Sequence, residues 1–325
     1  MRVRTLLAIV CTASLQISFA ANPASDNAAD PAYNKPYPQW VTGDNGGQGF
    51  GPWTLTTVNN GGFFTGSSTN NGGITSGGID SLNTSNALVS WGLWANSNAG
   101  PAEIVGYRPF TGGSLNVGQT FEIYMDNGYN DGVVGFVLRT GNDTTSKNNG
   151  QRFEFLHVHG APTYAAYSTV YSNSTVGYTE GGLKVAFTLT GADTFSVTIT
   201  DLTGNASQTI TGALAGTSGS GIDSVALYDE NTHSDASWDL YFNKMSVGDF
   251  GVKAAQLVDG TNAVVAFGTS TNAVYNIETN SDLTVSSGWT PLVSNVAGNG
   301  GTIVMTNSVP DGTAQLFYRV RMTLP

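Results

Sequence analysis

Two carboxylates stand at strand spacing in residues 119–140, where apolar and polar side chains alternate. Glu122 and Asp126 are four residues apart, so a strand of period two places both on one face. A retaining glycosidase needs two carboxyl groups about 5 Å apart, whereas four strand residues separate these by roughly 13 Å. The spacing fits hydrolysis poorly, and an aspartate followed by Asn127 and Gly128 is also typical of a turn.

Metal ligation is a second chemistry that the residue types allow. His157 and His159 share one strand face and could bind a metal with a carboxylate as third ligand, but structural hydrogen bonding explains them better. Calcium prefers six to eight oxygen ligands, and residues 126–131 and 229–239 are rich in oxygen donors. The first stretch is equally a turn sequence, so we expect a structural calcium ion at the second. Its predicted ligands are Asp229, Glu230, Asp235 and Asp239.

Aromatic and polar side chains together could bind a sugar. Tyr164, Tyr167, Tyr171 and Tyr178 lie in a loop-like segment after the histidines. Tyrosine rings stack on the apolar face of a sugar, while carboxylates and amides bind its hydroxyls; packing of the loop against the domain is the alternative. The solvent faces of the predicted strands would complete this surface. The predicted ligand-binding residues are Glu122, Tyr124, Asp126, Arg152, Glu154, Tyr164 and Tyr167.

The elements that must position these residues are β-strands. Residues 119–140 predict a β-hairpin with Phe121, Ile123 and Met125 inward on the first arm and a turn at 126–132. Further alternating runs follow at short, regular spacing without a helical stretch between them, which is typical of a sandwich. These runs are residues 152–159, 183–189, 194–200, 224–228 and 238–242.

Composition supports an all-β protein and excludes one class of partner. The 325 residues carry a formal net charge of -11, and 42 of them are glycine. Only 11% of the residues are charged, against about 25% in an average domain. Long surface helices need more Glu, Lys and Arg than this. An acidic chain without a Lys/Arg cluster is also a poor nucleic-acid binder.

The N-terminus predicts export. Arg2 and Arg4 precede a weakly apolar run over residues 5–19, which resembles a secretory signal more than a membrane span. We expect a signal peptide over residues 1–20, which removes Cys11, the only cysteine. Residues 21–39 contain four prolines and predict a flexible arm. No second long apolar run is present, so the sequence predicts no transmembrane anchor.

The strand rhythm restarts after Phe250. Five short alternating runs between Ala263 and Met322 are enough for a small β module. We therefore predict a sandwich over residues 40–250 and a C-terminal module over residues 253–325, with a role in cell-surface attachment or spacing.

A family resemblance supports this division. Residues 40–247 resemble secreted bacterial jelly-roll domains of the concanavalin-A-like lectin/glucanase superfamily, and the tail resembles short modules at the C-termini of secreted bacterial proteins. The resemblance implies a jelly-roll fold and an extracellular role that often involves glycans. The family's acidic run Glu-x-Asp-x-x-Glu is absent. The residues that carry the resemblance include Asp44-Asn45-Gly46-Gly47, Trp91-Gly92-Leu93, Asp126-Asn127-Gly128, Phe153-Glu154-Phe155 and Asp239-Leu240-Tyr241-Phe242.

Jelly-roll polysaccharide lyases supply the enzymatic alternative. Arg152 with Glu154, and the strand of Tyr241, are similar to strands of their cleft, in which a tyrosine moves a proton while Arg and His neutralise a uronate. The lyase interpretation names Arg152, His157 and Tyr241 as catalytic. The Gln-x-His strand of those enzymes is missing, however, and Arg152 and His157 have opposite strand parity.

The sequence thus predicts a jelly-roll (concanavalin-A-like) β-sandwich, followed by a small β-sandwich-like module, in an exported, non-catalytic protein that binds a glycan or cell-surface polymer. Calcium is the one expected cofactor. A polysaccharide lyase, a glycoside hydrolase and a structural or adhesive surface protein are the alternatives.

Overall fold

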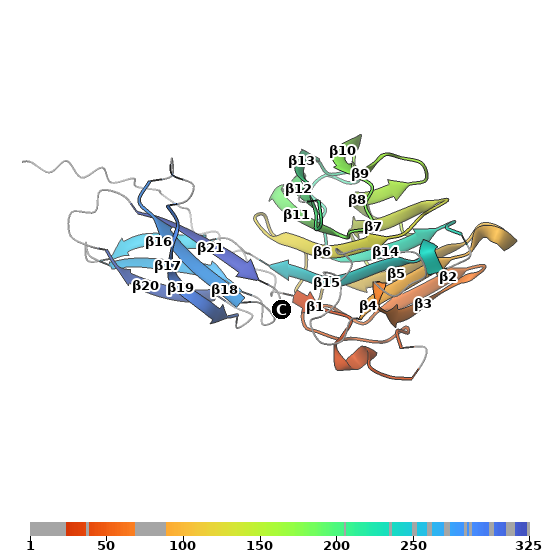
Figure 1. Ribbon diagram of the computed structural model, residues 1–325, viewed down its shortest axis with the longest axis horizontal. Coiled ribbons are helices and arrows are strands. Elements are labelled where there is room, and N and C mark those ends of the chain that lie inside the picture. Colours follow the sequence, from red (N-terminus) through yellow and green to blue (C-terminus); the bar gives the residue numbers. More distant parts are fainter. Residues whose placement is uncertain are drawn as a thin grey trace, which may run out of the picture.

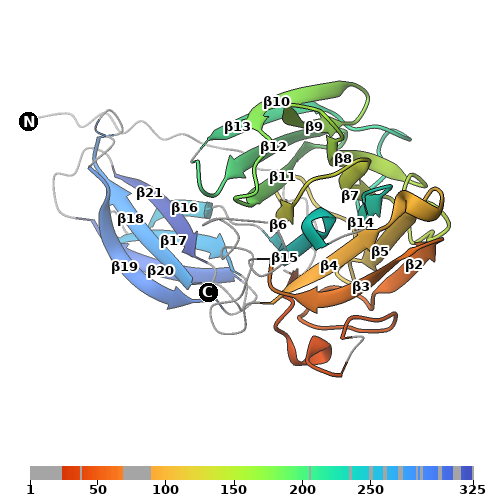
Figure 2. The same ribbon diagram turned by 45° about the vertical axis from the view of Figure 1, so that its right-hand side comes forward.

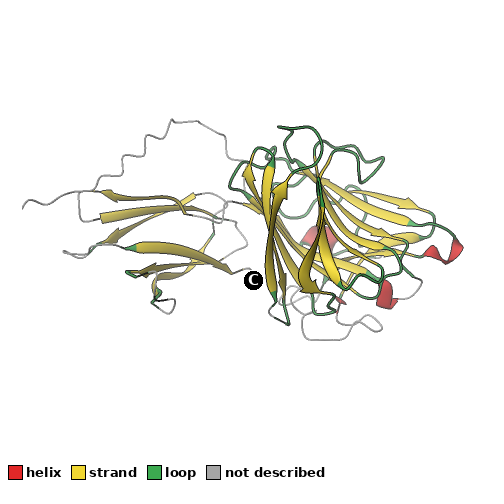
Figure 3. Cartoon of the chain, turned by 90° about the horizontal axis from the view of Figure 1, so that it is seen from above, coloured by secondary structure: helices red, strands yellow, loops and turns green. Residues whose placement is uncertain are grey.

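β-strands are the dominant regular structure of the described chain. The computed structural model describes residues 24–36, 39–68, 89–204, 206–233, 236–248, 252–258, 262–269, 274–282, 285, 288–298, 302–309 and 316–323. Short 3-10 turns, among them η1 (Pro31–Tyr33), η4 (Ser97–Ala99) and η5 (Ala236–Trp238), interrupt the strands (Figure 3). In the described part no helix has the length and apolar character needed to cross a membrane. The predicted signal peptide, residues 1–20, lies outside the described residues.

Two antiparallel sheets form the larger body, drawn from red to teal in Figure 1. The eight-stranded sheet has the order β13 (Ser207–Ala213), β12 (Thr194–Asp201), β11 (Leu183–Gly191), β6 (Thr120–Asn127), β15 (Leu240–Gly248), β4 (Ser90–Ala95) and β3 (Gly61–Gly66), and β1 (Ala24–Asp26) pairs with β15. The seven-stranded sheet has the order β10 (Tyr171–Gly177), β9 (Thr163–Tyr167), β8 (Gln151–Val158), β7 (Val133–Arg139), β14 (Ser224–Glu230), β5 (Glu103–Pro109) and β2 (Thr54–Val58).

The core lies between these two sheets and is rich in aromatic rings. Strict alternation in β11 and β12 buries every second residue, as the period-2 pattern predicts. Rings from the two sheets meet across the interior: the centroids of Phe153 and Phe187 are 4.8 Å apart, and those of Phe121 and Phe136 are 5.6 Å apart. The predicted fold class, an all-β jelly-roll-like sandwich, is confirmed.

The predicted hairpin over residues 119–140 is wrong in one respect. Both arms are strands, β6 and β7, but they belong to different sheets and do not pair with each other. The reason is that both inner faces are apolar throughout, so the arms gain more by packing Phe121 against Phe136 across the core than by lying side by side. Residues 128–132 therefore cross from one sheet to the other.

A second, smaller pair of sheets follows in the chain (Figure 2). One has the order β16 (Val252–Val258), β17 (Asn262–Gly268) and β20 (Thr302–Ser308), and the other has the order β19 (Thr290–Ala297), β18 (Val274–Asn280) and β21 (Phe317–Thr323). Phe267, Tyr275 and Ile277 form their shared core. This small β-sandwich agrees with the predicted fold and adds β16, which the sequence did not reveal. The predicted boundary at 250–255 falls partly on residues outside the description.

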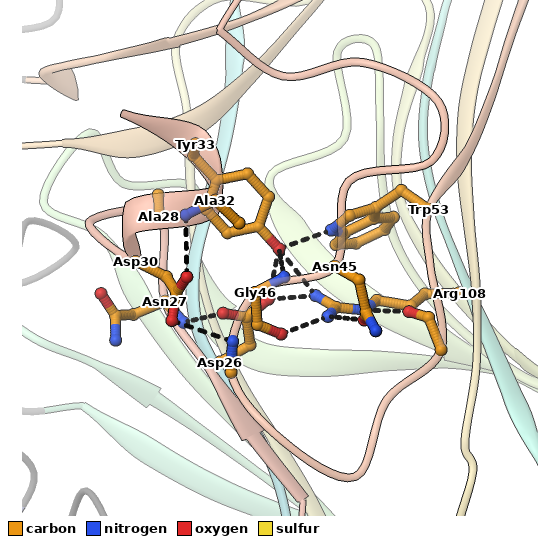
Figure 4. A network of polar contacts seen from close by, with 12 residues as sticks. Asp26, Asn27, Ala28, Asp30, Ala32, Tyr33, Asn45, Gly46, Trp53 and Arg108 are labelled. Atoms are coloured by element: carbon orange, nitrogen blue, oxygen red, sulfur yellow. Dashed lines mark hydrogen bonds and ion pairs between the residues drawn. The ribbon is translucent and has the colours of Figure 1, made fainter. Parts of the chain in front are cut away.

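The N-terminal segment is built into the sandwich, which corrects the expectation of a flexible arm over residues 21–39. Described residues 24–36 add β1 to the sheet and bury Tyr33. Figure 4 shows the reason: Asp26 pairs with the fully buried Arg108, and the Tyr33 hydroxyl lies 3.1 Å from Arg108 Nη1 and 3.0 Å from Trp53 Nε1. The proline-rich composition gave no sign of these partners, which lie far along the chain.

Gly47 allows the following loop to pack against the N-terminal segment. It has a φ of +67°, and a Cβ atom there would lie 2.1 Å from the carbonyl oxygen of Ser25. Only glycine lets the loop of residues 43–52 approach β1 so closely.

Candidate functional site

The predicted binding face is divided between the two sides of the sandwich. Glu122, Tyr124 and Asp126 lie on β6 in the eight-stranded sheet, whereas Arg152 and Glu154 lie on β8 in the seven-stranded sheet. All five point away from the core, as strand parity predicted, because their neighbours along the strands form the core. The two outer faces are nevertheless on opposite sides of the molecule, so these residues do not form one surface.

The outer face of the eight-stranded sheet is largely covered. Glu122 is buried, and one of its oxygens lies 2.8 Å from Lys184 Nζ. Tyr124 is partly buried and packs with Phe64 and Tyr241 in a small apolar cluster. Burial raises the pKa of the Tyr124 hydroxyl. The expected open, solvent-facing tyrosine is therefore a packed one.

Asp126 is the most deeply buried acid on this face. In the described part of the chain neither carboxylate oxygen accepts a hydrogen bond of good geometry. Burial raises its pKa well above the usual range; the Ser68 side chain opposes this shift and Glu180 adds to it. Asp126 is thus held as a poorly solvated acid, a property that strand spacing alone did not predict.

The outer face of the seven-stranded sheet carries two exposed tyrosines beside a buried carboxylate, Glu154. Tyr171, Tyr167 and Glu154 lie directly opposite one another on the adjacent strands β10, β9 and β8. The two tyrosines are 45% and 40% exposed, their ring centroids are 6.4 Å apart, and their planes are tilted by 42°. We call these three residues the tyrosine row. It places two exposed rings beside one carboxylate.

The carboxylate of the row is fixed in position. The Tyr228 hydroxyl donates a hydrogen bond of 2.6 Å to Glu154 Oε1, and Gln151 Nε2 donates one of 3.2 Å to Oε2. Burial raises the pKa of Glu154, while the bond from Tyr228 and the charge of Lys147 lower it. Glu154 therefore has a fixed direction, and its oxygens keep lone pairs for further donors.

Lys147 limits the row on one side. Its ammonium group lies 2.7 Å from Glu230 and 3.1 Å from Glu103, and 4.8 Å from the centre of the Tyr228 ring. The segment between β7 and β8 is thereby anchored on this face. It leaves Glu154 as the carboxylate nearest the exposed tyrosines.

Two predicted binding residues have structural roles instead. Tyr164 is fully buried, and its hydroxyl donates a 2.9 Å hydrogen bond to Asn127 Oδ1. Its parity along β9 is opposite to that of Tyr167, so it faces the core. Arg152 is buried on the outer face, where Nη1 donates to the carbonyl oxygens of Ala215 and Thr217 and Nη2 pairs with Asp193 at 2.5 Å. Its guanidinium ties β8 to the loop after β13.

The lyase residues Arg152, His157 and Tyr241 are not brought together. Tyr241 is buried on the outer face of the opposite sheet, and His157 points inward from β8. His157 Nε2 lies 3.0 Å from the carbonyl oxygen of Ala161, and Asn130 Nδ2 lies 3.0 Å from Nδ1. A neutral ring that donates through Nε2 and accepts through Nδ1 satisfies both contacts. These positions contradict the lyase assignment.

The predicted calcium ligands diverge. Asp229 faces the interior, where the Thr232 hydroxyl donates to it at 2.8 Å, whereas Glu230 points outward to Lys147. Asp239 lies near Tyr241, at 3.5 Å from its hydroxyl. Asp235 lies outside the described residues. Among the residues that the structure describes, no three His, Cys, Asp or Glu side chains are grouped closely enough to hold a metal. Calcium at residues 229–239 stays a prediction.

The sequence did contain a signal for the tyrosine row, namely the spacing between Tyr167 and Tyr171. Tyr167 and Tyr171 flank a three-residue link, and a short hairpin loop of that length places its flanking residues opposite each other on one face. Glu154 was expected on this outer face, but its partners Gln151 and Tyr228 were not predicted. The contact to Tyr228 joins residues 74 positions apart, so no local pattern announces it.

Comparison with known proteins gives distant structural likenesses. No family model matches the sequence, and no curated protein matches it. The chain is similar to the CBM2 module of the evolved Dit of Lactobacillus casei BL23 phage J-1, with 13% identity and a TM-score of 0.37, over 70% of this chain and 96% of that one. The glycoside hydrolase domain of Endo-D from Streptococcus pneumoniae R6 has 11% identity and a TM-score of 0.34; the alignment covers 83% of this chain and 36% of that one.

A third likeness is to the family 11 carbohydrate-binding module of Clostridium thermocellum, with 6% identity and a TM-score of 0.27, over 69% of this chain and 95% of that one. At these identities and TM-scores, what the chain binds has to be argued from its own residues.

Proposed function

We propose that this chain is an exported, non-catalytic carbohydrate-binding protein, and that the tyrosine row binds a neutral glycan or cell-surface polymer. The observation that carries the proposal is the alignment of Tyr171, Tyr167 and Glu154 across three strands, with two exposed rings beside a fixed carboxylate. Exposed aromatic rings on a rigid sheet are costly to leave in water and suit the apolar face of a sugar. A carboxylate held by Tyr228 and Gln151 accepts hydroxyl hydrogen bonds without having to be ordered on binding.

Charge favours a neutral ligand over an acidic one. The chain carries a net charge of -11, and Glu154 is the carboxylate of the row. A polyanion would meet repulsion from both. The nearest cation, Lys147, is already engaged by Glu103 and Glu230. A sugar with neutral hydroxyls pairs with Glu154 without leaving a second charge unpaired.

The same geometry supports binding without catalysis. Glycoside hydrolysis uses two carboxyl groups, about 5 Å apart in retaining enzymes and roughly 6.5–9.5 Å apart in inverting ones. The row contributes one, and the other acids that we locate on this face are paired with cations: Glu103 and Glu230 with Lys147, and Asp193 with Arg152. A binding surface is the simpler role for one oriented carboxylate and two exposed rings.

A glycan array probed with the mature chain, residues 21–325, tests the proposal. Titration calorimetry with the best ligand then measures how much the tyrosine row contributes to the affinity. We expect millimolar to micromolar affinity, roughly -4 to -8 kcal/mol. Tyr171→Ala should weaken binding by more than about 1 kcal/mol without changing the melting temperature, whereas Tyr171→Phe, which keeps the ring, should retain most of the affinity. Binding that is indifferent to Tyr167→Ala and Tyr171→Ala would remove the row from the site. An array without any bound glycan, together with self-association in sedimentation, would favour the structural or adhesive alternative.

Export and attachment complete the proposal. Arg2, Arg4 and the apolar run over residues 5–19 support a signal peptide, and the small C-terminal sandwich suits attachment or spacing at the cell surface. Mass spectrometry of exported protein should find a mature N-terminus near Ala21. Truncation after Phe250 should release the protein from the cell-surface fraction. An intact Met1 in exported protein contradicts the first expectation, and unchanged fractionation contradicts the second.

A further inference from the structure

Three aromatic rings form a continuous strip at the end of the sandwich where β6, β8 and β14 finish. Tyr129 comes from the crossing between β6 and β7, and Trp238 and His233 come from the segment between β14 and β15. The centroids of Tyr129 and Trp238 are 5.7 Å apart, and those of Trp238 and His233 are 4.9 Å apart. We call these residues the loop-end strip. The short turn η5, which ends at Trp238, precedes β15 in Figure 1.

The strip is fixed by the backbone. The amide of Tyr129 donates a 3.0 Å hydrogen bond to the carbonyl oxygen of Ser237, which joins the two segments that carry the rings. Gly132, at the end of the same crossing, lies so close to β14 that a Cβ atom would be 1.9 Å from the carbonyl oxygen of Glu230. Both contacts hold the rings in place before any ligand arrives, which lowers the entropy cost of binding.

The exposure of Tyr129 separates this strip from ordinary core packing. A second group of rings, Tyr164, His157 and Tyr178, lies at the same end with centroid distances of 5.1 and 5.2 Å. Its members Tyr164 and His157 are buried, as packing requires. Tyr129 is instead 54% exposed. The fold therefore keeps an aromatic ring on the surface although a buried aromatic group already fills the interior beside it.

Polar groups stand beside the strip in the same loop. Asp131 and His159 form an exposed pair with 3.3 Å between Oδ1 and Nδ1. Asn130, which lies between Tyr129 and Asp131, is 7% exposed and donates through Nδ2 to His157, while its Oδ1 has no hydrogen-bond partner among the described residues. The aromatic rings and the exposed acid Asp131 together match the apolar face and the hydroxyl-rich edge of a sugar.

The strip is separate from the tyrosine row. Glu154 and Val158 are four residues apart on β8, which corresponds to roughly 13 Å along a strand. Tyr167 and Tyr171 flank the β9–β10 link, whereas β9 begins at the end of the sandwich that carries the strip. β15 begins at the end of the sandwich that carries the strip and ends at the opposite end. The C-terminal module therefore follows in the chain from the end opposite the strip.

We propose that the loop-end strip is a second carbohydrate-binding subsite, which contacts a different segment of the same polysaccharide chain, or a second chain, from the one on the tyrosine row. The inference rests on the proposed function for the class of ligand, and on the geometry of Tyr129, Trp238 and Asp131 for the site. Two subsites on one rigid body raise the apparent affinity for a polymer far above that for an oligosaccharide that reaches only one of them.

Affinity electrophoresis of the mature chain in native gels tests this inference. The gels contain mixed-linkage β-glucan, xylan, galactomannan or laminarin, each at several concentrations. With the polysaccharide that retards the wild type most, we expect Tyr129→Ala and Trp238→Ala each to raise the dissociation constant by about five-fold or more. Tyr129→Phe keeps the ring and is the matched control. Tyr129→Ala combined with Tyr171→Ala should lose more retardation than either variant alone.

The variants also separate this inference from the proposed function. If Tyr171→Ala weakens retardation and Tyr129→Ala does not, the strip is no subsite and the tyrosine row stands. If Tyr129→Ala weakens it and Tyr171→Ala does not, the strip is supported and the row fails. No retardation in any of the four polysaccharides overturns both. If circular dichroism shows that Trp238→Ala is unfolded, Tyr129→Ala and Trp238→Phe decide the question instead. Tyr129→Ala should still weaken retardation. Trp238→Phe should reduce the change in intrinsic fluorescence that the wild type shows on titration with the polysaccharide.

Discussion

Two buried aspartates lie on strands that pair with β15, and they differ in the partners that surround their carboxylates. Asp26 on β1 and Asp126 on β6 are 2% and 1% exposed. Burial raises the pKa of both carboxyls. Asp26 accepts hydrogen bonds from the Tyr33 hydroxyl at 2.5 Å and the Asn27 amide at 2.8 Å, and it pairs with Arg108. Asp126 has no comparable partner among the described residues.

The difference teaches how a buried acid should be interpreted. Asp26 lies inside the sandwich, and its partners tie the N-terminal segment to β5, with Arg108 flanked by the rings of Phe50 and Trp53. Such an acid is structural, because removing it leaves a buried cation alone. Asp126 lies on an outer face where its charge is only a cost. Burial or a raised pKa by itself therefore marks neither acid as catalytic.

The largest effect should follow from breaking the paired acid. Asp26→Ala leaves Arg108 buried without its anion, and we expect the free energy of unfolding to fall by about 3–5 kcal/mol. Urea denaturation followed by tryptophan fluorescence measures it.

The double variant Asp26→Ala with Arg108→Met is the control for that change. Because it removes the lone cation as well, it should recover part of the lost stability. A single variant as stable as the wild type would mean that the pair does not hold the N-terminal segment.

The unpaired acid should respond in the opposite direction. Asp126→Asn removes a carboxyl group whose ionisation burial disfavours and whose oxygens accept no hydrogen bond of good geometry from the described residues, so we expect the free energy of unfolding at pH 7 to rise by about 1–3 kcal/mol. The sign follows from linkage: the folded pKa is raised, so the wild type loses stability as pH rises from about 4 toward the folded pKa. The gain from Asp126→Asn should therefore shrink toward pH 4, in melts recorded from pH 4 to 8. A destabilised variant at pH 7 would mean that the ionised carboxylate has a partner.

The sequence anticipated one of these acids only in part. Alternation placed Asp126 correctly on the outer face of β6, because a period of two determines which face a side chain takes. It could not show that the face is covered, since Phe64 and Tyr241, which pack beside it, come from other strands. Asp26 fell in a segment predicted to be flexible. Its order depends on Arg108, 82 residues further along the chain, and such a contact has no local signature.

The candidate site shows the same division. Parity identified Glu154 as an outward-facing residue, and the tyrosine-rich, loop-like segment after the histidines singled out Tyr167; both lie in the tyrosine row. Parity alone could not reveal that β6 and β8 belong to different sheets, because apolar inner faces look alike whether strands pair side by side or pack face to face. The loss of Arg152 and Tyr164 from the site has a related cause. Their partners Asp193 and Asn127 are brought to them by tertiary packing.

The covered face can be tested at Tyr124. Because its ring packs with Phe64 and Tyr241 and lies 5.5 Å from Lys244 Nζ, Tyr124→Ala should lower the free energy of unfolding by about 1–2 kcal/mol through lost packing. Glycan affinity, measured by the same calorimetry as for Tyr171→Ala, should not change. An unchanged melting temperature with a weakened affinity would restore the outer face of β6 as a binding surface.

The smallest effect concerns His157, a buried ring whose two nitrogens both have hydrogen-bond partners. Burial lowers the pKa of His157, and the backbone contact at Ala161 only partly offsets this. Below about pH 6.5 the unfolded chain binds a proton that the folded ring resists, so stability should fall as pH decreases from 7 to 5. His157→Gln should remove this dependence in thermal melts. Equal pH slopes for wild type and His157→Gln would mean that the ring takes up its proton as readily when folded.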